Sequence, residues 1–70
     1  MHRKNHLKTY REEAGLKKAE LARLANVSVS TINNIEGGYD AGNVIKHRLI
    51  NGLNASPHTT KQYTVEDIFP

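Results

Sequence analysis

The chain has 70 residues, no cysteine, 37% hydrophobic residues and a formal net charge of +3. A chain of this length builds one small domain, whose core supplies about 3–5 kcal/mol and leaves little room for a catalytic pocket. The lack of cysteine excludes disulfides, thiolate metal sites and thiol catalysis. No apolar run approaches the roughly 18 residues of a membrane span. We therefore expect a cytoplasmic domain that is not an enzyme and has no membrane partner.

The positive charge is concentrated in the first third of the chain. Residues 1–23 hold seven Lys or Arg and three Glu, whereas the remaining 47 residues hold three Lys or Arg and four acidic residues. A basic segment of this kind favours a polyanionic partner. On charge alone, a solvated charged surface is the alternative explanation.

The first predicted helix covers residues 5–14. Leu7 and Tyr10 lie on one of its faces, and Gly15 follows as the residue that ends the helix in a left-handed conformation. No alternating apolar and polar run is long enough to predict a strand anywhere in the chain. The expected fold class is therefore all-α.

Four further helix starts carry the hydrophobic staple, in which an apolar residue before the N-cap packs against the fourth helical residue. Ser28, Asp40 and Thr64 are N-cap residues whose side chains accept hydrogen bonds. At the fourth start, Lys17 cannot accept one, although Glu20 supplies half of a capping box. The staple pairs in chain order are Leu16–Leu21, Val27–Ile32, Tyr39–Val44 and Tyr63–Ile68.

These signals predict five helices in a single compact domain, residues 1–70. After the first helix they place the others at 18–25, 29–37, 41–53 and 65–69. The segment 54–63 is polar and contains Pro57, which predicts a loop before the fifth helix.

The connection between the second and third helices has a mere three residues, beginning with Asn26. Helices joined this closely cross steeply and need a small residue at their contact, which Ala22 supplies. The turn needs a left-handed residue, and asparagine tolerates that conformation second only to glycine. Ile32 and Ile35 have the helical spacing to lock the third helix in place. This arrangement is a helix-turn-helix at 18–37.

The segment GLKKAELARLANVSVSTINNIEGGY resembles the lambda-repressor/Cro-like helix-turn-helix family of transcriptional regulators, also called the XRE family. The most specific elements are ELA at 20–22, VS at 27–28, STI at 30–32 and IE at 35–36. The resemblance runs over residues 6–53 and resumes at TVEDIF, residues 64–69. It implies a five-helix DNA-binding domain in which Arg11 and Glu36 form a partly buried ion pair.

Four features depart from the family's pattern. Lys17 stands where the family has Ser or Thr, and Lys18 where it has Gln. Asn26 replaces a turn glycine, and residues 55–63 resemble an insertion where the family needs one or two residues. The two lysines bear on DNA contact, and the insertion bears on how the fifth helix packs.

The outward face of the third helix follows from a rotation of about 100° per residue. Base contacts are predicted on this uncharged face at Ser30, Asn33 and Asn34. Val29 is predicted as a further contact, because it lies at an intermediate angle in the first turn, where base edges are usually reached. An asparagine pairs bidentately with adenine, and a valine methyl packs on a thymine methyl, which favours A·T pairs. The alternative is that both asparagines are ordinary polar surface residues.

Phosphate contacts are predicted at the helix ends. Lysines at a helix N-terminus oppose the macrodipole by about 0.3–1 kcal/mol each, but they become favourable beside phosphate. Lys17 and Lys18 begin the second helix, and Ser28 resembles a further phosphate-contacting position at the third. Gly37 and Gly38 permit close approach of their backbone amides. The alternative for the lysines is that both are solvated.

The histidines do not indicate a metal site. His2 and His6 have i,i+4 spacing, but they lie near the chain start and no carboxylate supports them. The sequence also has no Ser/His/Asp arrangement and no glycine-rich phosphate loop. We expect no metal, no cofactor and no catalytic residue.

Two functions fit these observations. The first is a repressor that binds double-stranded DNA at an inverted repeat in the nucleoid as a homodimer. Its interface is expected among Ile50, Leu53, Val65, Ile68 and Phe69, unless these residues only close the monomer core. The second is a protein-interaction module, such as an antitoxin or accessory factor, which the neutral third helix keeps open. RNA binding lacks support because exposed aromatic residues are nearly absent.

Overall fold

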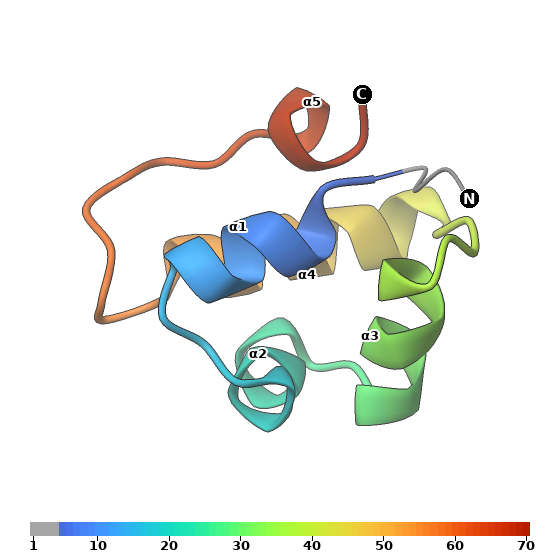
Figure 1. The fold of residues 1–70 in the computed structure, drawn as a ribbon, viewed down its shortest axis with the longest axis horizontal. Coiled ribbons are helices and arrows are strands. Elements are labelled where there is room, and N and C mark those ends of the chain that lie inside the picture. Colours follow the sequence, from blue (N-terminus) through green and yellow to red (C-terminus); the bar gives the residue numbers. More distant parts are fainter. Residues whose placement is uncertain (1–4) are drawn as a thin grey trace.

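The structure is a computed structural model that describes residues 5–70. Within this range the chain is all-α, with helices α1 (Leu7–Glu13), α2 (Lys18–Ala25), α3 (Val29–Glu36), α4 (Asn43–Asn54) and α5 (Val65–Ile68) (Figure 1). Helix α2 packs against both α3 and α4, α3 also contacts α1, and α5 covers α4. In Figure 1, α5 and α2 lie at opposite ends of the molecule, and α3 forms one side.

All five helices contribute to one hydrophobic core. Leu7, Leu21, Ile32, Leu49 and Ile68, one from each helix, are fully buried. Helices of this length are marginal alone in water, so packing of their apolar faces holds them. The five-helix prediction is therefore confirmed.

The ends of α1, α2, α3 and α5 lie within two residues of the predicted positions. Ser28 caps α3 by accepting the Thr31 N–H at 3.0 Å, and Thr64 accepts the N–H of Asp67 at 3.4 Å. Gly15 ends α1 with a φ of +74°. Each of these signals acts within a few residues along the chain, which is why the sequence predicts them.

The start of α4 also lies within two residues of its predicted position, but its predicted N-cap and staple are wrong. The helix begins at Asn43 after Gly42, not at residue 41 after an Asp40 N-cap, and its N-cap residue has no side-chain hydrogen bond. The first helical bond runs from the Lys46 N–H to the Gly42 carbonyl at 2.9 Å. Tyr39 and Val44 are 69% and 65% exposed, so they do not form the predicted staple.

The irregular segment is 55–64, one residue later than the predicted loop 54–63, and it is tied to the core. Asn54 ends α4 and bonds the backbone of Tyr63 twice, through its Oδ1 at 2.7 Å and its Nδ2 at 3.1 Å. Ser56 Oγ donates to the Ala14 carbonyl at 2.7 Å. Tyr63 is 2% exposed, and its burial anchors the chain directly before Thr64, the N-cap residue of α5. These bonds explain how a long connection still positions the last helix.

Lys61 forms a second link between this segment and α1. Its Nζ lies 3.4 Å from Glu13 Oε1 and 4.8 Å from the centre of the Tyr10 ring. Desolvation lowers the pKa of Lys61, but the hydrogen bond and charge of Glu13 outweigh it and leave the pKa raised. Lys61 is therefore a charged residue with a local partner.

The predicted dimer interface is wrong for three of its residues. Ile50, Leu53 and Ile68 are 7%, 0% and 0% exposed, because they pack in the core of their own chain. Val65 and Phe69 are half-buried against the same core. The alternative, that these residues close the monomer core, is the one that the structure supports.

Candidate nucleic-acid interface

The turn between α2 and α3 has the predicted geometry. Asn26 adopts the left-handed conformation, with φ 57° and ψ 47°. The N–H of Val27 donates to the Ala22 carbonyl at 3.0 Å, which closes the end of α2. Ala22 is buried, as the close contact of the two helices requires. The turn fixes the direction in which α3 leaves α2.

A buried ion pair ties α3 to α1. Arg11 donates from Nε to Glu36 Oε2 at 2.6 Å and from Nη2 to Oε1 at 3.3 Å. Its Nη1 donates to the Leu16 carbonyl at 2.8 Å. Both side chains are less than a tenth exposed. The pairing implied by the family resemblance is therefore present, and it holds the C-terminal end of α3.

Asn5 adds a second tie that sequence reasoning missed. Its Nδ2 donates to the Ile35 carbonyl at 2.8 Å, and its Oδ1 accepts the Leu7 N–H at 3.0 Å. The Asn5 side chain therefore satisfies the first amide of α1 and a carbonyl at the end of α3. One sequence signal was available, because asparagine is a common N-cap residue and Asn5 lies two positions before Leu7. It was not accompanied by a hydrophobic staple.

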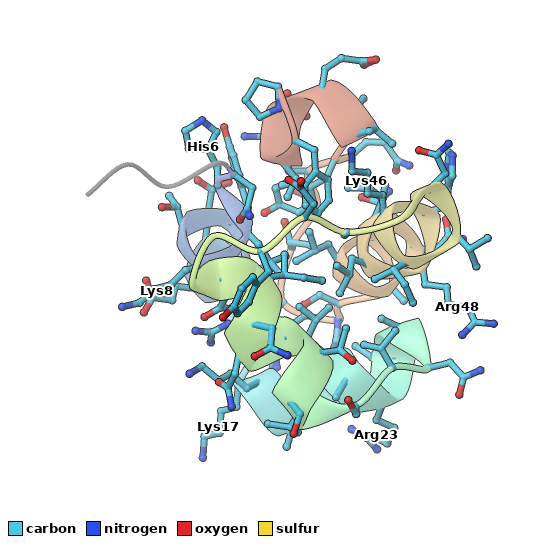
Figure 2. The ribbon with its side chains drawn as sticks, turned by 90° about the vertical axis from the view of Figure 1, so that its right-hand side faces the viewer. His6, Lys8, Lys17, Arg23, Lys46 and Arg48 are labelled. Atoms are coloured by element: carbon cyan, nitrogen blue, oxygen red, sulfur yellow. The ribbon has the colours of Figure 1, made fainter. Side chains whose placement is uncertain are left out.

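The four predicted base-contact residues all lie on exposed positions of α3. Ile32 and Ile35 are buried in the core, Ser30, Asn33 and Asn34 lie on the opposite face, and Val29 lies at the edge of that face in the first turn. Val29 is 40% exposed despite its apolar side chain. Figure 2 looks onto this side of the molecule, with α3 in front. The structure therefore presents one uncharged helix surface to the solvent.

The predicted phosphate-contact residues at the helix starts are also exposed. Lys17 precedes α2 and Lys18 opens it, and neither side chain has a carboxylate partner among the described residues. Glu20 accepts the Lys17 N–H at 3.1 Å, but no side chain caps the first turn of α2. The Ser28 hydroxyl is exposed and also bonds the Thr31 hydroxyl at 2.8 Å. Both helix starts face solvent.

The amides of Gly37 and Gly38 are not free donors, which corrects the expected mode of contact there. The Gly37 N–H donates to the Asn33 carbonyl, and the Gly38 N–H donates to the Ile35 carbonyl, each at 3.0 Å. These bonds close the C-terminal end of α3 and occupy both protons. What the two glycines offer is a surface without side chains.

Besides the predicted Lys17, three cations that the sequence analysis did not select border α3, namely Lys8, Arg23 and Arg48. Figure 2 shows Lys8 and Lys17 on one side of α3, and Arg23 and Arg48 on the other. Within the described residues, none of the four forms an ion pair. Arg23 and Arg48 belong to α2 and α4, so only the tertiary fold brings them to the same side of α3. Sequence spacing alone carried no signal for this.

Residues 5–70 contain no group of three or more His, Cys, Asp or Glu placed to hold a metal ion. No helix in this range is long and apolar enough to cross a membrane. His2 lies outside the described residues, and His6 is exposed with its ring at 85° to the ring of Tyr10. The His2–His6 spacing, from which no metal site was expected, is therefore not tested by the described residues.

A family model described as a helix-turn-helix domain matches residues 5–61. The comparison with curated proteins gave no match, and neither did the comparison with solved structures. The matched range includes α1 to α4 and the left-handed turn at Asn26. The helix-turn-helix is a DNA-binding motif whose second helix enters the major groove. With that motif at α2 and α3 and a match over most of its length, the chain belongs to the helix-turn-helix domain family.

Proposed function

We propose that this chain is a sequence-specific regulator of transcription that binds double-stranded DNA and represses as a homodimer on an inverted repeat. The observation that supports this most strongly is the uncharged, exposed face of α3, bordered by cations without carboxylate partners. A helix of this kind reads base edges in the major groove, while surrounding cations contact the phosphates. Its place of action would be the nucleoid, in the cytoplasm.

Base reading is assigned to the exposed residues of α3. Val29 and Ser30 lie in its first turn, where base edges are usually reached. Asn33 and Asn34 follow in the next turn, and a carboxamide pairs bidentately with adenine N6 and N7. The Val29 methyl groups suit a thymine methyl. We therefore expect half-sites whose core is rich in A·T pairs.

Phosphate contact is assigned to the starts of α2 and α3. Lys17 and Lys18 lie beside the uncapped first turn of α2, where amides and cations together attract an anion. The Ser28 hydroxyl contributes at the start of α3. Gly37 and Gly38 contribute by letting the DNA backbone approach the end of α3 without side chains in the way.

Two copies are needed because one helix-turn-helix reads only a few base pairs. Paired recognition helices read half-sites about 34 Å apart, one turn of the duplex, which gives the inverted repeat. Occupation of such a site within a promoter would exclude RNA polymerase. Regulation would follow from the concentration of the chain or from a partner protein.

A protein-interaction module remains the second candidate function, and one observation favours it. Tyr39 and Val44 are large apolar side chains that are more than three-fifths exposed and take no part in the core. Tyr39 also lines a hollow of about 200 Å³ together with Asn34 and Ile45. A protein partner could cover this surface, with or without DNA.

The test separates phosphate contact from base reading. Lys18→Ala should weaken binding to operator and random duplex alike and reduce the slope of log K against log salt by about 0.9. Asn34→Ala removes no charge, so it should leave that slope unchanged. It should cost about 1–3 kcal/mol on the operator and relax the preference at one position per half-site. Operators are first selected from random duplexes, and titrations follow at several salt concentrations.

The wild-type chain and a scrambled duplex are the controls in each titration. A wild type that prefers no duplex and shows no salt dependence would overturn the DNA-binding proposal. The protein-interaction function would then take its place. Equal losses on operator and scrambled duplex for Asn34→Ala would remove Asn34 from the base-reading set.

A further inference from the structure

We infer that Arg23 and Arg48 form a second phosphate-binding surface, so that the duplex is held from both sides of α3. This second rim is defined by these two residues and lies across α3 from Lys8 and Lys17 (Figure 2). The inference rests on the proposed DNA binding and extends it beyond the helix-turn-helix to α4. The partner it commits to is the sugar–phosphate backbone of double-stranded DNA.

Arg48 is positioned by the turn that precedes α3. Its Nη1 donates to the Asn26 carbonyl at 3.3 Å, which fixes the guanidinium beside this turn. A guanidinium has five N–H donors, and this bond is the one that the described residues provide. The side chain is exposed, and no carboxylate pairs with it. Arg48 therefore presents an oriented cation whose remaining donors are available to an anion.

Arg23 extends the same rim from α2. It lies in the last turn of that helix, its side chain is exposed, and it has no ion pair within the described residues. Arginine also suits this position because it complements the negative end of the helix dipole. Arg48 has a structural role of its own, since its bond to the Asn26 carbonyl stabilises the turn. Both structural roles are independent of DNA, so experiment can separate them from phosphate contact.

The dimensions of DNA explain why a rim on each side is useful. The major groove is about 12 Å wide, and an α-helix with its side chains measures about 10–12 Å across. A helix in the groove therefore has a phosphate strand on each side. Lys17 and Lys18 at the start of α2 can hold one strand, and the second rim reaches the other. Arginine favours this role because its planar fork binds phosphate bidentately.

The experiment measures the salt dependence of DNA binding. Arg23→Gln and Arg48→Gln should each reduce the slope of log K against log salt by about 0.9, and the double variant by about 1.8. Lys61→Gln is the matched control, since it removes the same charge from the segment 55–64, which lies away from α3 (Figure 1). Its slope should equal that of the wild type. Arg48→Lys keeps the charge and should keep the slope.

A second measurement locates the contacts on the DNA. Single methylphosphonates neutralise one phosphate at a time along each strand of the selected operator. The wild type should lose affinity at positions on both strands, and Arg48→Gln should become insensitive at one or two of them. Insensitivity at those positions would confirm direct contact, because a brace for the turn cannot produce it.

Three outcomes are distinguishable. If the Gln variants lower the melting temperature but keep the wild-type slope, the two arginines are structural and the inference is overturned. If Lys61→Gln reduces the slope equally, net charge explains the effect and the inference is again overturned. If the wild type binds no duplex, the proposed function itself fails.

Discussion

On the buried side of α3, Glu36 is bonded twice by Arg11, and the carbonyl of Ile35 is bonded by Asn5. On its outward side, Arg23 and Arg48 have no carboxylate partner within the described residues. The buried polar groups are satisfied by the chain itself, since an unpaired buried charge costs several kcal/mol. The exposed cations carry no such requirement and remain available to an external anion.

The distribution of acidic residues adds to this contrast. Four of the seven are on α1 and α5, namely Glu12, Glu13, Glu66 and Asp67. Glu36 is buried with Arg11, and Glu20 accepts the Lys17 N–H. The seventh, Asp40, is exposed after the end of α3 and lines the hollow beside Asn34. The outward face of α3 therefore has basic residues at its borders and no acidic residue of its own that is exposed. This arrangement attracts phosphate and does little for stability.

The largest loss of folding stability is expected from breaking the buried ion pair between Arg11 and Glu36. Removing one partner of a buried ion pair costs about 3–5 kcal/mol, which equals the whole stability of a core this small. Arg11→Ala and Glu36→Ala should therefore be largely unfolded at 25 °C. The paired replacement Arg11→Met with Glu36→Leu should retain a folded state, because it leaves no charge buried. Far-UV circular dichroism and urea unfolding measure all three.

The double variant Arg11→Ala with Glu36→Ala completes the cycle. Its loss should be clearly smaller than the sum of the two single losses, since each single change leaves an unpaired charge. Where a single variant is too unstable, osmolyte-stabilised titrations bring all members into range. Additive losses would show that the two residues do not interact.

A smaller loss of folding stability is expected from a substitution at the contact between α2 and α4. A Cβ at Gly52 would lie 2.9 Å from Ala25 Cβ and 3.0 Å from the Ala25 backbone nitrogen. In an exposed helix, Gly→Ala stabilises by about 1 kcal/mol. Here the added methyl forces the helices apart, so Gly52→Ala should destabilise by about 1–3 kcal/mol. Urea unfolding measures whether the free energy of unfolding falls or rises. A rise would show that α2 and α4 shift enough to accommodate the added methyl group.

What the sequence predicts well in this fold is local. The Ser28 cap, the left-handed Asn26 and the end of α1 at Gly15 each depend on neighbouring residues. What it misses depends on distant partners: Asn5 bonds a carbonyl 30 residues away, and Tyr63 is fixed by Asn54 nine residues earlier. No periodicity encodes such bonds.

The failure of the predicted Asp40 cap and Tyr39–Val44 staple at the start of α4 has a local cause. Gly38 adopts a φ of +109°, and the Tyr39 N–H donates back to the Asn34 carbonyl at 3.0 Å. The chain leaves α3 in a direction that keeps Tyr39 in solvent, and α4 starts only after Gly42. The apolar spacing of Tyr39 and Val44 was present without the backbone geometry that a staple requires.

In the candidate interface, too, local features can be predicted from the sequence, and features that depend on tertiary packing cannot. The exposed positions on α3 follow from helical periodicity, so sequence predicts them. The state of the Gly37 and Gly38 amides depends on how α3 ends, and sequence does not reveal that their protons are used. The position of Arg48 beside the turn depends on the packing of α4 against α2. A rim built from separate helices becomes visible only in the folded chain.

The smallest change in stability is expected at the start of α2. There, Lys17 bears both on the stability of the helix and on the proposed DNA contact. Lys17 occupies an N-cap position without accepting a hydrogen bond, and its charge opposes the helix dipole. Lys17→Ser supplies the missing acceptor and should raise the unfolding free energy by about 1 kcal/mol. It also removes one cation from the surface, so the salt slope of DNA binding should fall by about 0.9. Urea unfolding and salt titrations of the same variant measure both. A more stable variant with an unchanged salt slope would show that Lys17 is solvated and contacts no phosphate. A more stable variant with a reduced slope would show that Lys17 contacts phosphate and destabilises the start of α2.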